Sequence, residues 1–251
     1  MYLLHSSTFQ SGVMASRSLT VGAAAVATTL HLAPTEHSAN NLRREGYAEP
    51  TILVVGNTIV DAVQRIHGPR VSVPVVNQVP LVLVTLHRRE SFGEPIARVL
   101  DALKTLAIER TGKLKIVYPV HPNPKVDGPA RAALANVPGV ELHAPMDYPE
   151  FLRLFGQARF VMSDSGGVQE EGPSLSVPVL VLRETTERPE VISSGWGKLV
   201  GTDRDLILTE ARRLLDDDDA LAEMKRGANP FGDGHAADRI VHALWQGLAG
   251  R

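Results

Sequence analysis

The sequence lacks cysteine altogether and is poor in aromatic residues, which make up 5% of its 251 residues. Without cysteine, the chain has neither disulfide bonds nor thiolate metal ligands. An excess of charge is also missing, because 26 basic and 28 acidic residues leave a formal net charge of −2. This balance gives no electrostatic reason to expect binding to nucleic acid or to an anionic membrane, and we expect neither partner.

A long hydrophobic run is absent as well. The segment SLTVGAAAVATTLHLA (18–33) resembles the apolar part of a signal peptide, but it is rich in Ala and Thr and is interrupted by His31. It also falls short of the ~20 apolar residues that a membrane helix needs. Export remains the alternative interpretation. We expect a cytoplasmic protein, which the lack of cysteine also suits.

What the chain does contain is an alternation of short apolar runs with amphipathic segments, starting near residue 50. Most of the runs are continuously apolar, which is typical of strands covered on both faces. We expect strands at 51–56, 81–87, 115–120, 140–145, 159–164, 177–183 and 197–201, and helices at 96–110, 128–137, 149–158 and 203–217. This alternation predicts an α/β fold with a doubly wound parallel sheet, Rossmann-like in type.

The end of the chain departs from this alternation of strands and helices. The aspartate run 216–219 is typical of one helix ending and the next being capped. Beyond the turn-forming NPFGDG, an apolar stripe follows helical spacing, and we interpret its side chains as packing residues. The stripe consists of Ile240, Val241, Leu244, Trp245 and Leu248.

Three polar loops follow strands of the predicted sheet. They are HRRE after the run at 81–87, HPNP after the run at 115–120, and SDSGG after the run at 159–164. In open parallel sheets, ligands bind where the carboxyl ends of the strands meet the loops and the helix N-termini. The sequence therefore predicts one site at which these loops converge.

The stretch VMSDSGGVQEE (161–171) is the strongest local signal for that site. A strand that leads through SDSGG into a helix presents unpaired backbone N–H groups to an anion, and most often to a phosphate. The hydroxyl of Ser165 adds a donor, and Glu171 is placed to accept hydrogen bonds from vicinal hydroxyls such as those of a ribose. The pattern is neither GxGxxG nor a Walker A loop. A plain tight turn that needs glycine is the structural alternative.

Basic residues stand near the other predicted strand ends. His87 and Arg88 follow one apolar run, where cations would meet a pyrophosphate, and Arg188 follows another in RETTERPE. Solvated surface charges and ordinary ion pairs are the alternative interpretation for these residues.

In this order, these motifs resemble the non-hydrolysing UDP-N-acetylglucosamine 2-epimerase family. The resemblance runs from about residue 30 to the end of the chain. The matching segments are APTEHSANNLRREG (33–46), GNTIVDAV (56–63), VTLHRRESFGEP (84–95), VYPVHPNPKV (117–126), MSDSGGVQEEGPSL (162–175), PVLVLRETTERPE (178–190), KLVGTD (198–203) and NPFGDGHAADRI (229–240).

The resemblance implies the C-terminal lobe of a two-lobed, glycosyltransferase-B-type architecture. Residues 1–46 would be a non-matching leader with a remnant of the N-terminal lobe, and residues 47–251 the UDP-binding lobe with the C-terminal helix. The family interconverts UDP-GlcNAc and UDP-ManNAc by eliminating UDP to a 2-acetamidoglucal and adding it back with carbon 2 inverted. The resemblance implies no metal and no cofactor.

Site residues follow from the same resemblance. His87 would be catalytic and contact the diphosphate, and Arg188 would lie near the sugar and the diphosphate. Ser165, Gly166 and Gly167 would bind phosphate oxygens. The ribose and the uracil would be held by Glu171 and Phe151. Positions Arg88 and His121 match those that serve an allosteric UDP-GlcNAc site in bacterial members of the family.

One part of the family pattern is missing. The carboxylates that move protons at carbon 2 come from the N-terminal lobe, and residues 1–29 show no counterpart to that segment. Glu36 and Glu90 are carboxylates near the matched motifs, but we assign neither of them as the base at carbon 2. We therefore expect a homodimer or a partner chain that supplies the missing lobe.

Three functions remain open. The leading one is an epimerase that acts on UDP-GlcNAc, incomplete as this chain stands. The others are a non-catalytic UDP-sugar-binding module and a hydrolysing variant that releases UDP. A glycosyltransferase of the same architecture is disfavoured by HRRESFG, SDSGGVQEE and TTERPE taken together.

Overall fold

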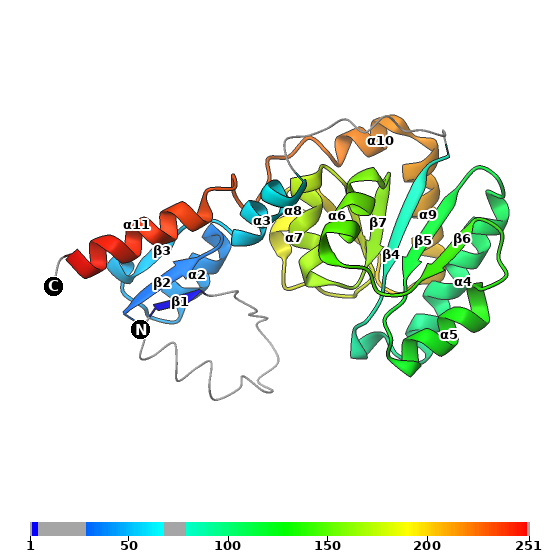
Figure 1. Ribbon diagram of the computed structural model, residues 1–251, viewed down its shortest axis with the longest axis horizontal. Coiled ribbons are helices and arrows are strands. Elements are labelled where there is room, and N and C mark those ends of the chain that lie inside the picture. Colours follow the sequence, from blue (N-terminus) through cyan, green and yellow to red (C-terminus); the bar gives the residue numbers. More distant parts are fainter. Residues whose placement is uncertain (1, 5–28, 68–78, 250–251) are drawn as a thin grey trace. The chain divides into compact units, whose positions relative to one another are not determined.

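The computed structural model describes residues 2–4, 29–67 and 79–249, which form two compact units (Figure 1). One unit holds the described residues up to 65 together with those from 229 onward, and the other holds those from 66 to 228. The leader predicted for residues 1–29 lies almost wholly outside the described residues. The two units divide the chain after residues 65 and 228. The lobe boundary predicted after residue 46 stays a prediction.

The larger unit is built on a six-stranded, wholly parallel sheet in the order β6-β5-β4-β7-β8-β9. This arrangement confirms the predicted doubly wound α/β fold and six of the seven predicted strands; the seventh, at 51–56, is β3 of the smaller unit. The strands are β4 (Leu81–Thr85), β5 (Lys115–Pro119), β6 (Val140–His143), β7 (Phe160–Ser163), β8 (Val179–Val181) and β9 (Gly197–Leu199).

Helices cover both faces of this sheet. They are α4 (Glu94–Glu109), α5 (Pro124–Leu134), α6 (Tyr148–Gln157), α7 (Gly166–Leu175), α8 (Pro189–Ser193), α9 (Arg204–Asp216) and α10 (Asp218–Glu223). Val82 and Val84 of β4 pack into the core formed with α4, α5 and α9, and Leu83 between them packs with α6 and α7 on the opposite face. Because neighbouring residues of one strand are both buried, the central strands read as continuous apolar runs.

One helix starts earlier than the sequence predicted. α5 begins at Pro124 rather than near residue 128, because the side chain of Asn123 caps it and accepts a hydrogen bond from the backbone N–H of Lys125 at 2.9 Å. Pro124 suits the first helical position, where its missing N–H has no partner to lose. The motif HPNP therefore both ends a strand region and starts a helix.

The smaller unit contains three parallel strands in the order β1-β2-β3, namely β1 (Tyr2–Leu4), β2 (Leu30–Ala33) and β3 (Ile52–Val54). Its helices are α2 (Glu36–Arg44), α3 (Thr58–His67) and α11 (Ala236–Ala249). Asp61 of α3 caps α11 by accepting from the backbone N–H groups of Ala236 and Ala237. No helix in the described ranges is long and apolar enough to cross a membrane.

The apolar stripe of α11 differs from its prediction. We expected Val241 and Trp245 to pack, but their side chains are 64% and 73% exposed. They lie one helical turn apart, and no described element covers them. The interpretation as packing residues is therefore wrong for these two side chains in this chain taken alone.

Candidate functional site

The site lies where the chain changes direction across the sheet. From β4 the chain proceeds outward to β5 and β6, and then returns to the other side of β4 to form β7, β8 and β9. The carboxyl ends of β4 and β7 therefore flank the topological switch point, where open α/β sheets bind ligands. Contacts between the loops after β4, β5 and β7 confirm the predicted convergence of these loops, and the loop after β8 joins them.

Asp164, directly after β7, organises the loop after β4. Its side chain is fully buried. The carboxylate accepts hydrogen bonds from the backbone N–H of His87 at 3.1 Å and of Arg88 at 2.9 Å, and from the hydroxyl of Ser91 at 3.2 Å. A single buried carboxylate thus fixes the start of the short helix η2 (Arg89–Ser91).

The same carboxylate orients the imidazole of His87. The Nδ1 atom lies 3.2 Å from Oδ1 of Asp164, while the side chain as a whole is 40% exposed. Burial by itself would raise the pKa of Asp164, but the hydrogen bonds from His87 and Arg88 outweigh it and hold that pKa below its usual value. An ionised Asp164 fixes Nδ1 as the protonated nitrogen and leaves Nε2 for a ligand.

The start of α7 is open. Ser165 is its N-cap residue, yet no side chain of the described residues caps the first turn, so its N–H groups keep their capacity to bind an anion. Neither Gly166 nor Gly167 has a positive φ, so a tight turn does not require glycine at either position. A Cβ at Gly167 would meet only the hydroxyl of Ser165 at 3.8 Å.

Gly172, one and a half turns further along α7, provides the contrast. A Cβ there would lie 2.7 Å from Cγ2 of Val179 and 2.8 Å from the backbone oxygen of Val177. Glycine at this position is explained by packing of the helix on the sheet. The packing of the protein gives no such reason for glycine at 166 or 167.

Two arginines reach the start of α7 from different loops. A Cβ on Gly166 would lie 3.4 Å from Nη2 of Arg88 and 3.9 Å from Nη2 of Arg188. Each guanidinium also has a carboxylate neighbour, Glu187 at 3.8 Å from Arg88 and Glu170 paired with Arg188. Two cations thus stand beside the open helix N-terminus, where their charges add to that of the helix dipole.

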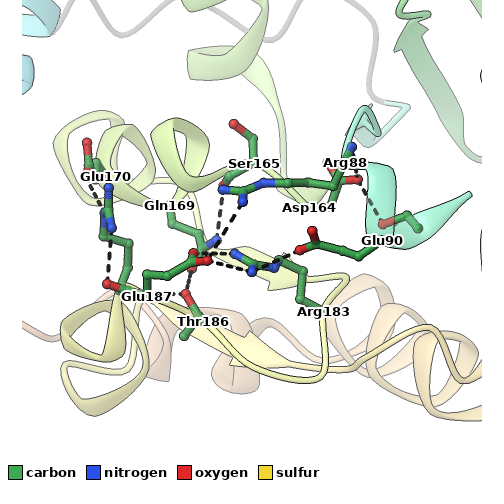
Figure 2. Close-up of polar contacts among 11 residues, drawn as sticks. Arg88, Glu90, Asp164, Ser165, Gln169, Glu170, Arg183, Thr186 and Glu187 are labelled. Atoms are coloured by element: carbon green, nitrogen blue, oxygen red, sulfur yellow. Dashed lines mark hydrogen bonds and ion pairs between the residues drawn. The ribbon is translucent and has the colours of Figure 1, made fainter. Parts of the chain in front are cut away.

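An ion-pair network holds the loop after β8 in place (Figure 2). Arg183, whose side chain is 9% exposed, pairs with Glu187 and, at 3.0 Å, with Glu90. The hydrogen bonds from Arg183 lower the pKa of Glu187 to about 2, so this carboxylate is ionised at neutral pH. In Figure 2, Glu187 lies between Arg183 and Arg88 and thereby links the loops after β4 and β8.

A second link joins the loop after β8 to α7. The hydroxyl of Thr186 donates to Oε1 of the buried Gln169, and Nε2 of Gln169 donates to the backbone oxygen of Ser165 at 3.1 Å (Figure 2). The loop that carries Arg188 is therefore tied to the residue that starts α7.

Glu171 lies one turn into α7 and faces α6. Its side chain is 6% exposed, and the hydroxyl of Tyr148 donates to its Oε1 at 2.8 Å. Burial raises the pKa of Glu171 to about 7, and the hydrogen bond from Tyr148 opposes that rise. Phe151 follows one turn after Tyr148 on α6 and is half-buried against Phe155.

The structure groups most of the residues that the sequence predicted. His87, Arg88, Ser165, Gly166, Gly167 and Arg188 meet at one edge of the sheet, and the ring of His121 lies 6.0 Å from that of His87. Glu171 and Phe151 are on the adjoining α7 and α6. The roles assigned to all of these residues, and the absence of a metal or cofactor, stay predictions.

Four functional neighbours were missed by the sequence analysis: Asp164, Gln169, Glu187 and Tyr148. Asp164 and Gln169 lie inside the motif VMSDSGGVQEE, and Glu187 lies inside RETTERPE. Their place beside the predicted site residues is the sequence signal that points to them. Tyr148 had no such signal, because its partner is 23 positions away on another helix.

Comparison with known proteins gives a consistent result. Residues 22–245 match the family model described as UDP-N-acetylglucosamine 2-epimerase. A UDP-N-acetylglucosamine 2-epimerase of Salmonella typhimurium is 43% identical over 226 residues, which cover 85% of this chain and 60% of the relative. The corresponding protein of Campylobacter jejuni is 40% identical over 237 residues, covering 88% and 62%. The chain thus spans about three fifths of the length of these relatives.

Solved structures agree with the sequence comparison. S. aureus MnaA, solved with UDP, has a TM-score of 0.83 at 36% identity, over 89% of this chain and 62% of the other. The UDP-GlcNAc 2-epimerase of Neisseria meningitidis bound to UDP-GlcNAc has a TM-score of 0.80 at 35% identity, over 88% and 62%.

Proposed function

The chain belongs to the UDP-N-acetylglucosamine 2-epimerase family, and from this membership we propose that it binds a UDP-sugar at the start of α7 and acts in the interconversion of UDP-GlcNAc and UDP-ManNAc. The observation that carries the proposal is the convergence of Arg88 and Arg188 on Gly166. Relatives solved with UDP or UDP-GlcNAc support the same class of ligand.

A diphosphate suits the geometry at this position. It carries two or three negative charges, and the site offers two guanidiniums and the unpaired N–H groups of a helix N-terminus. Gly166 and Gly167 keep the backbone accessible, which explains glycine where neither φ nor packing demands it. We assign the hydroxyl of Ser165 to the same phosphate oxygens.

The remaining predicted residues extend from the phosphates toward the two ends of the ligand. Glu171 on α7 would accept hydrogen bonds from the ribose hydroxyls, and Phe151 on α6 would lie along the uracil. His87, held at Nδ1 by Asp164, would present Nε2 to the diphosphate on the side of the sugar. Arg188 would lie between the sugar and the diphosphate.

These groups suit the bond-breaking half of the reaction. When the anomeric carbon–oxygen bond breaks, its electron pair goes to the diphosphate, and preorganised cations and N–H groups stabilise that growing charge. A base takes the proton from carbon 2, which gives the 2-acetamidoglucal. Adding UDP and a proton back, with the proton on the opposite face, completes the inversion.

The base for carbon 2 is not identified in the described residues. Two carboxylates lie near the matched motifs, and both are engaged in salt bridges. Glu90 pairs with Arg183, and Glu36 pairs with Arg43 in the other unit. We therefore propose that the base comes from a second chain. General base catalysis needs a carboxylate within hydrogen-bond reach of that proton.

The exposed apolar side chains of α11 support association with another chain. Val241 and Trp245 are 64% and 73% exposed, and covering a large aromatic side chain is favourable. We propose that a second copy or a partner chain covers them. Sedimentation velocity tests the second copy: Trp245→Glu should weaken association, and Ile108→Glu, at another exposed apolar residue, should leave it unchanged. If the wild-type protein is a monomer at all concentrations, the second copy is excluded, and a partner chain is the remaining candidate to cover these side chains.

Two narrower assignments belong to the same proposal. His121, together with Arg88, which also faces the first diphosphate, would help to hold a second, activating UDP-GlcNAc, since His121 stacks on His87 at 6.0 Å and so adjoins the first site. A cytoplasmic location stays a prediction.

Proton NMR of the purified chain with UDP-GlcNAc in deuterated water tests the function. Appearance of UDP-ManNAc with deuterium at carbon 2 is the expected result for a complete site. UDP binding without turnover would indicate the non-catalytic module, and accumulation of free UDP the hydrolysing variant. If neither UDP nor UDP-GlcNAc binds, the proposal is wrong. Ser165→Ala should weaken UDP binding in titration calorimetry, because it removes one phosphate donor.

A further inference from the structure

The contact between α6 and α7 joins the two elements proposed to hold the nucleoside. Tyr148 begins α6, where Asp147 caps the helix and accepts from the backbone N–H of Glu150 at 2.8 Å. The hydroxyl of Tyr148 donates to Oε1 of Glu171 at 2.8 Å. This is the hydrogen bond by which the start of α6 engages the middle of α7.

The two oxygens of Glu171 differ in their surroundings. Oε1 is held by Tyr148, whereas Oε2 accepts no hydrogen bond from the described residues and is not closed off from solvent. Since Glu171 as a residue is only 6% exposed, the orientation of its side chain is fixed by burial and by this one hydrogen bond. An ionised carboxylate with one oxygen held and one oxygen open can accept hydrogen bonds from a pair of vicinal hydroxyls.

We infer that Tyr148 is a positioning residue for the nucleoside: it holds Oε1 of Glu171, so that Oε2 is directed to the ribose hydroxyls, and it keeps Phe151 in register on the same face of α6. The inference rests on the proposed function, because it states how the protein would recognise the nucleoside part of UDP. Residues three apart on a helix lie on the same face, so one short helix sets both contacts.

The charged surroundings of Glu171 explain why a hydroxyl is suited to this task. Glu170, beside it on α7, disfavours its charge, and Arg188 at the start of α8 pairs with Glu170 instead of with Glu171. From α6 the group that faces it is Tyr148, and β8 contributes only apolar residues. In the described residues the donor that favours the ionised form is therefore the hydroxyl of Tyr148.

The inference is tested by measuring the ratio of affinities for UDP and 2′,3′-dideoxy-UDP from pH 5.5 to 9. The ratio isolates the ribose hydroxyls, because both ligands carry the same titrating diphosphate. In the wild-type protein the ratio should rise with pH as Glu171 ionises. In Tyr148→Phe the rise should move to higher pH, with about a tenfold lower UDP affinity at pH 7.5 and recovery at pH 9. Tyr47→Phe is the matched control.

The possible failures are distinguishable. If the wild-type protein does not bind UDP, the proposed function is wrong and this inference falls with it. If the wild-type protein binds UDP and Tyr148→Phe leaves the ratio and its pH dependence unchanged, the inference alone is overturned. A loss of affinity in Tyr148→Phe that is equal for both ligands at every pH also overturns it, because that loss would be merely structural. Glu171→Gln should abolish the pH dependence of the ratio.

Discussion

At the scale of single residues, the glycines of α7 serve two different purposes. Gly172 lets the helix approach Val179 of the sheet, while an added Cβ on Gly166 or Gly167 would meet only the ends of polar side chains at the helix start. The sequence shows only that glycine is present. The distances from an added Cβ show which glycine serves packing and which leaves room for a ligand.

Substitution by alanine should therefore have opposite consequences along one helix. Gly172→Ala should lower the free energy of unfolding by about 1–3 kcal/mol, because the added methyl group overlaps Val179 and the backbone of Val177. Gly167→Ala should change that free energy by less than about 1 kcal/mol, since only the Ser165 hydroxyl is near. It should nevertheless weaken UDP binding. Urea unfolding and titration calorimetry measure the two effects, and equal UDP affinity in Gly167→Ala and wild type would contradict the ligand explanation.

Asp164 is a second residue whose importance appears only in the fold. Asp164→Asn should lower the free energy of unfolding by about 2–4 kcal/mol, because a buried charged acceptor of several hydrogen bonds is lost. Nitrogen-15 NMR of His87 should show the proton leaving Nδ1 for a mixture of both nitrogens. Ser91→Ala removes one donor to the same carboxylate and should leave the His87 tautomer unchanged. An unchanged tautomer in Asp164→Asn would refute the role of Asp164.

At the scale of elements, the loops after β4 and β8 act as one unit because ion pairs cross between them. Arg183 follows β8, Glu90 follows β4, and Glu187 contacts both Arg183 and Arg88. Such a network holds the guanidinium of Arg88 and the loop that carries Arg188 in place before any ligand arrives, which lowers the cost of ordering them on binding.

Removing Arg183 should uncouple the loops. Arg183→Met leaves the half-buried Glu187 without its main partner, so the free energy of unfolding should fall by about 3 kcal/mol. A double-mutant cycle with Glu187→Gln in urea unfolding should give a coupling energy above about 1 kcal/mol. Arg131→Met, which breaks an exposed pair with Asp127 within α5, is the control and should cost less than about 0.5 kcal/mol. Additive losses at Arg183 and Glu187 would argue against the network.

The elements themselves were largely predictable. The strands β4, β7 and β8 are apolar apart from the terminal Thr85 and Ser163, because helices cover both faces of the sheet. The aspartate run does end α9 and cap α10 through Asp217. The start of α5 was wrong by four residues, because the cap at Asn123 depends on local geometry that HPNP alone does not specify. The tie from Tyr148 to Glu171 was missed because it joins two helices.

At the scale of the whole molecule, buried carboxyl groups should make stability depend on pH with two opposite signs. The pKa of Glu171 is raised from 4.5 to about 7. Between these values the folded chain keeps a proton that the unfolded chain releases, so the free energy of unfolding should fall as pH rises through that window. The pKa of Glu187 is lowered to about 2, so its contribution is lost as pH falls from 4.5 toward 2.

The expected result is a decline in stability of at most about 3 kcal/mol between pH 5 and pH 8 that is absent in Glu171→Gln. Urea unfolding at a series of pH values measures it, with Glu223→Gln, an exposed glutamate, as the control. A decline that persists unchanged in Glu171→Gln would show that another group is responsible.

The sequence by itself determined the fold class, the order of strands and helices, the family, and the segments that carry the site, because each of these depends on periodicity, turn chemistry or motifs along the chain. Only the tertiary structure decided which groups act together. It set the buried Asp164 behind His87, both guanidiniums over Gly166, and Tyr148 against Glu171. These pairings depend on how strands far apart in sequence become neighbours, and on which side chains lose their contact with water.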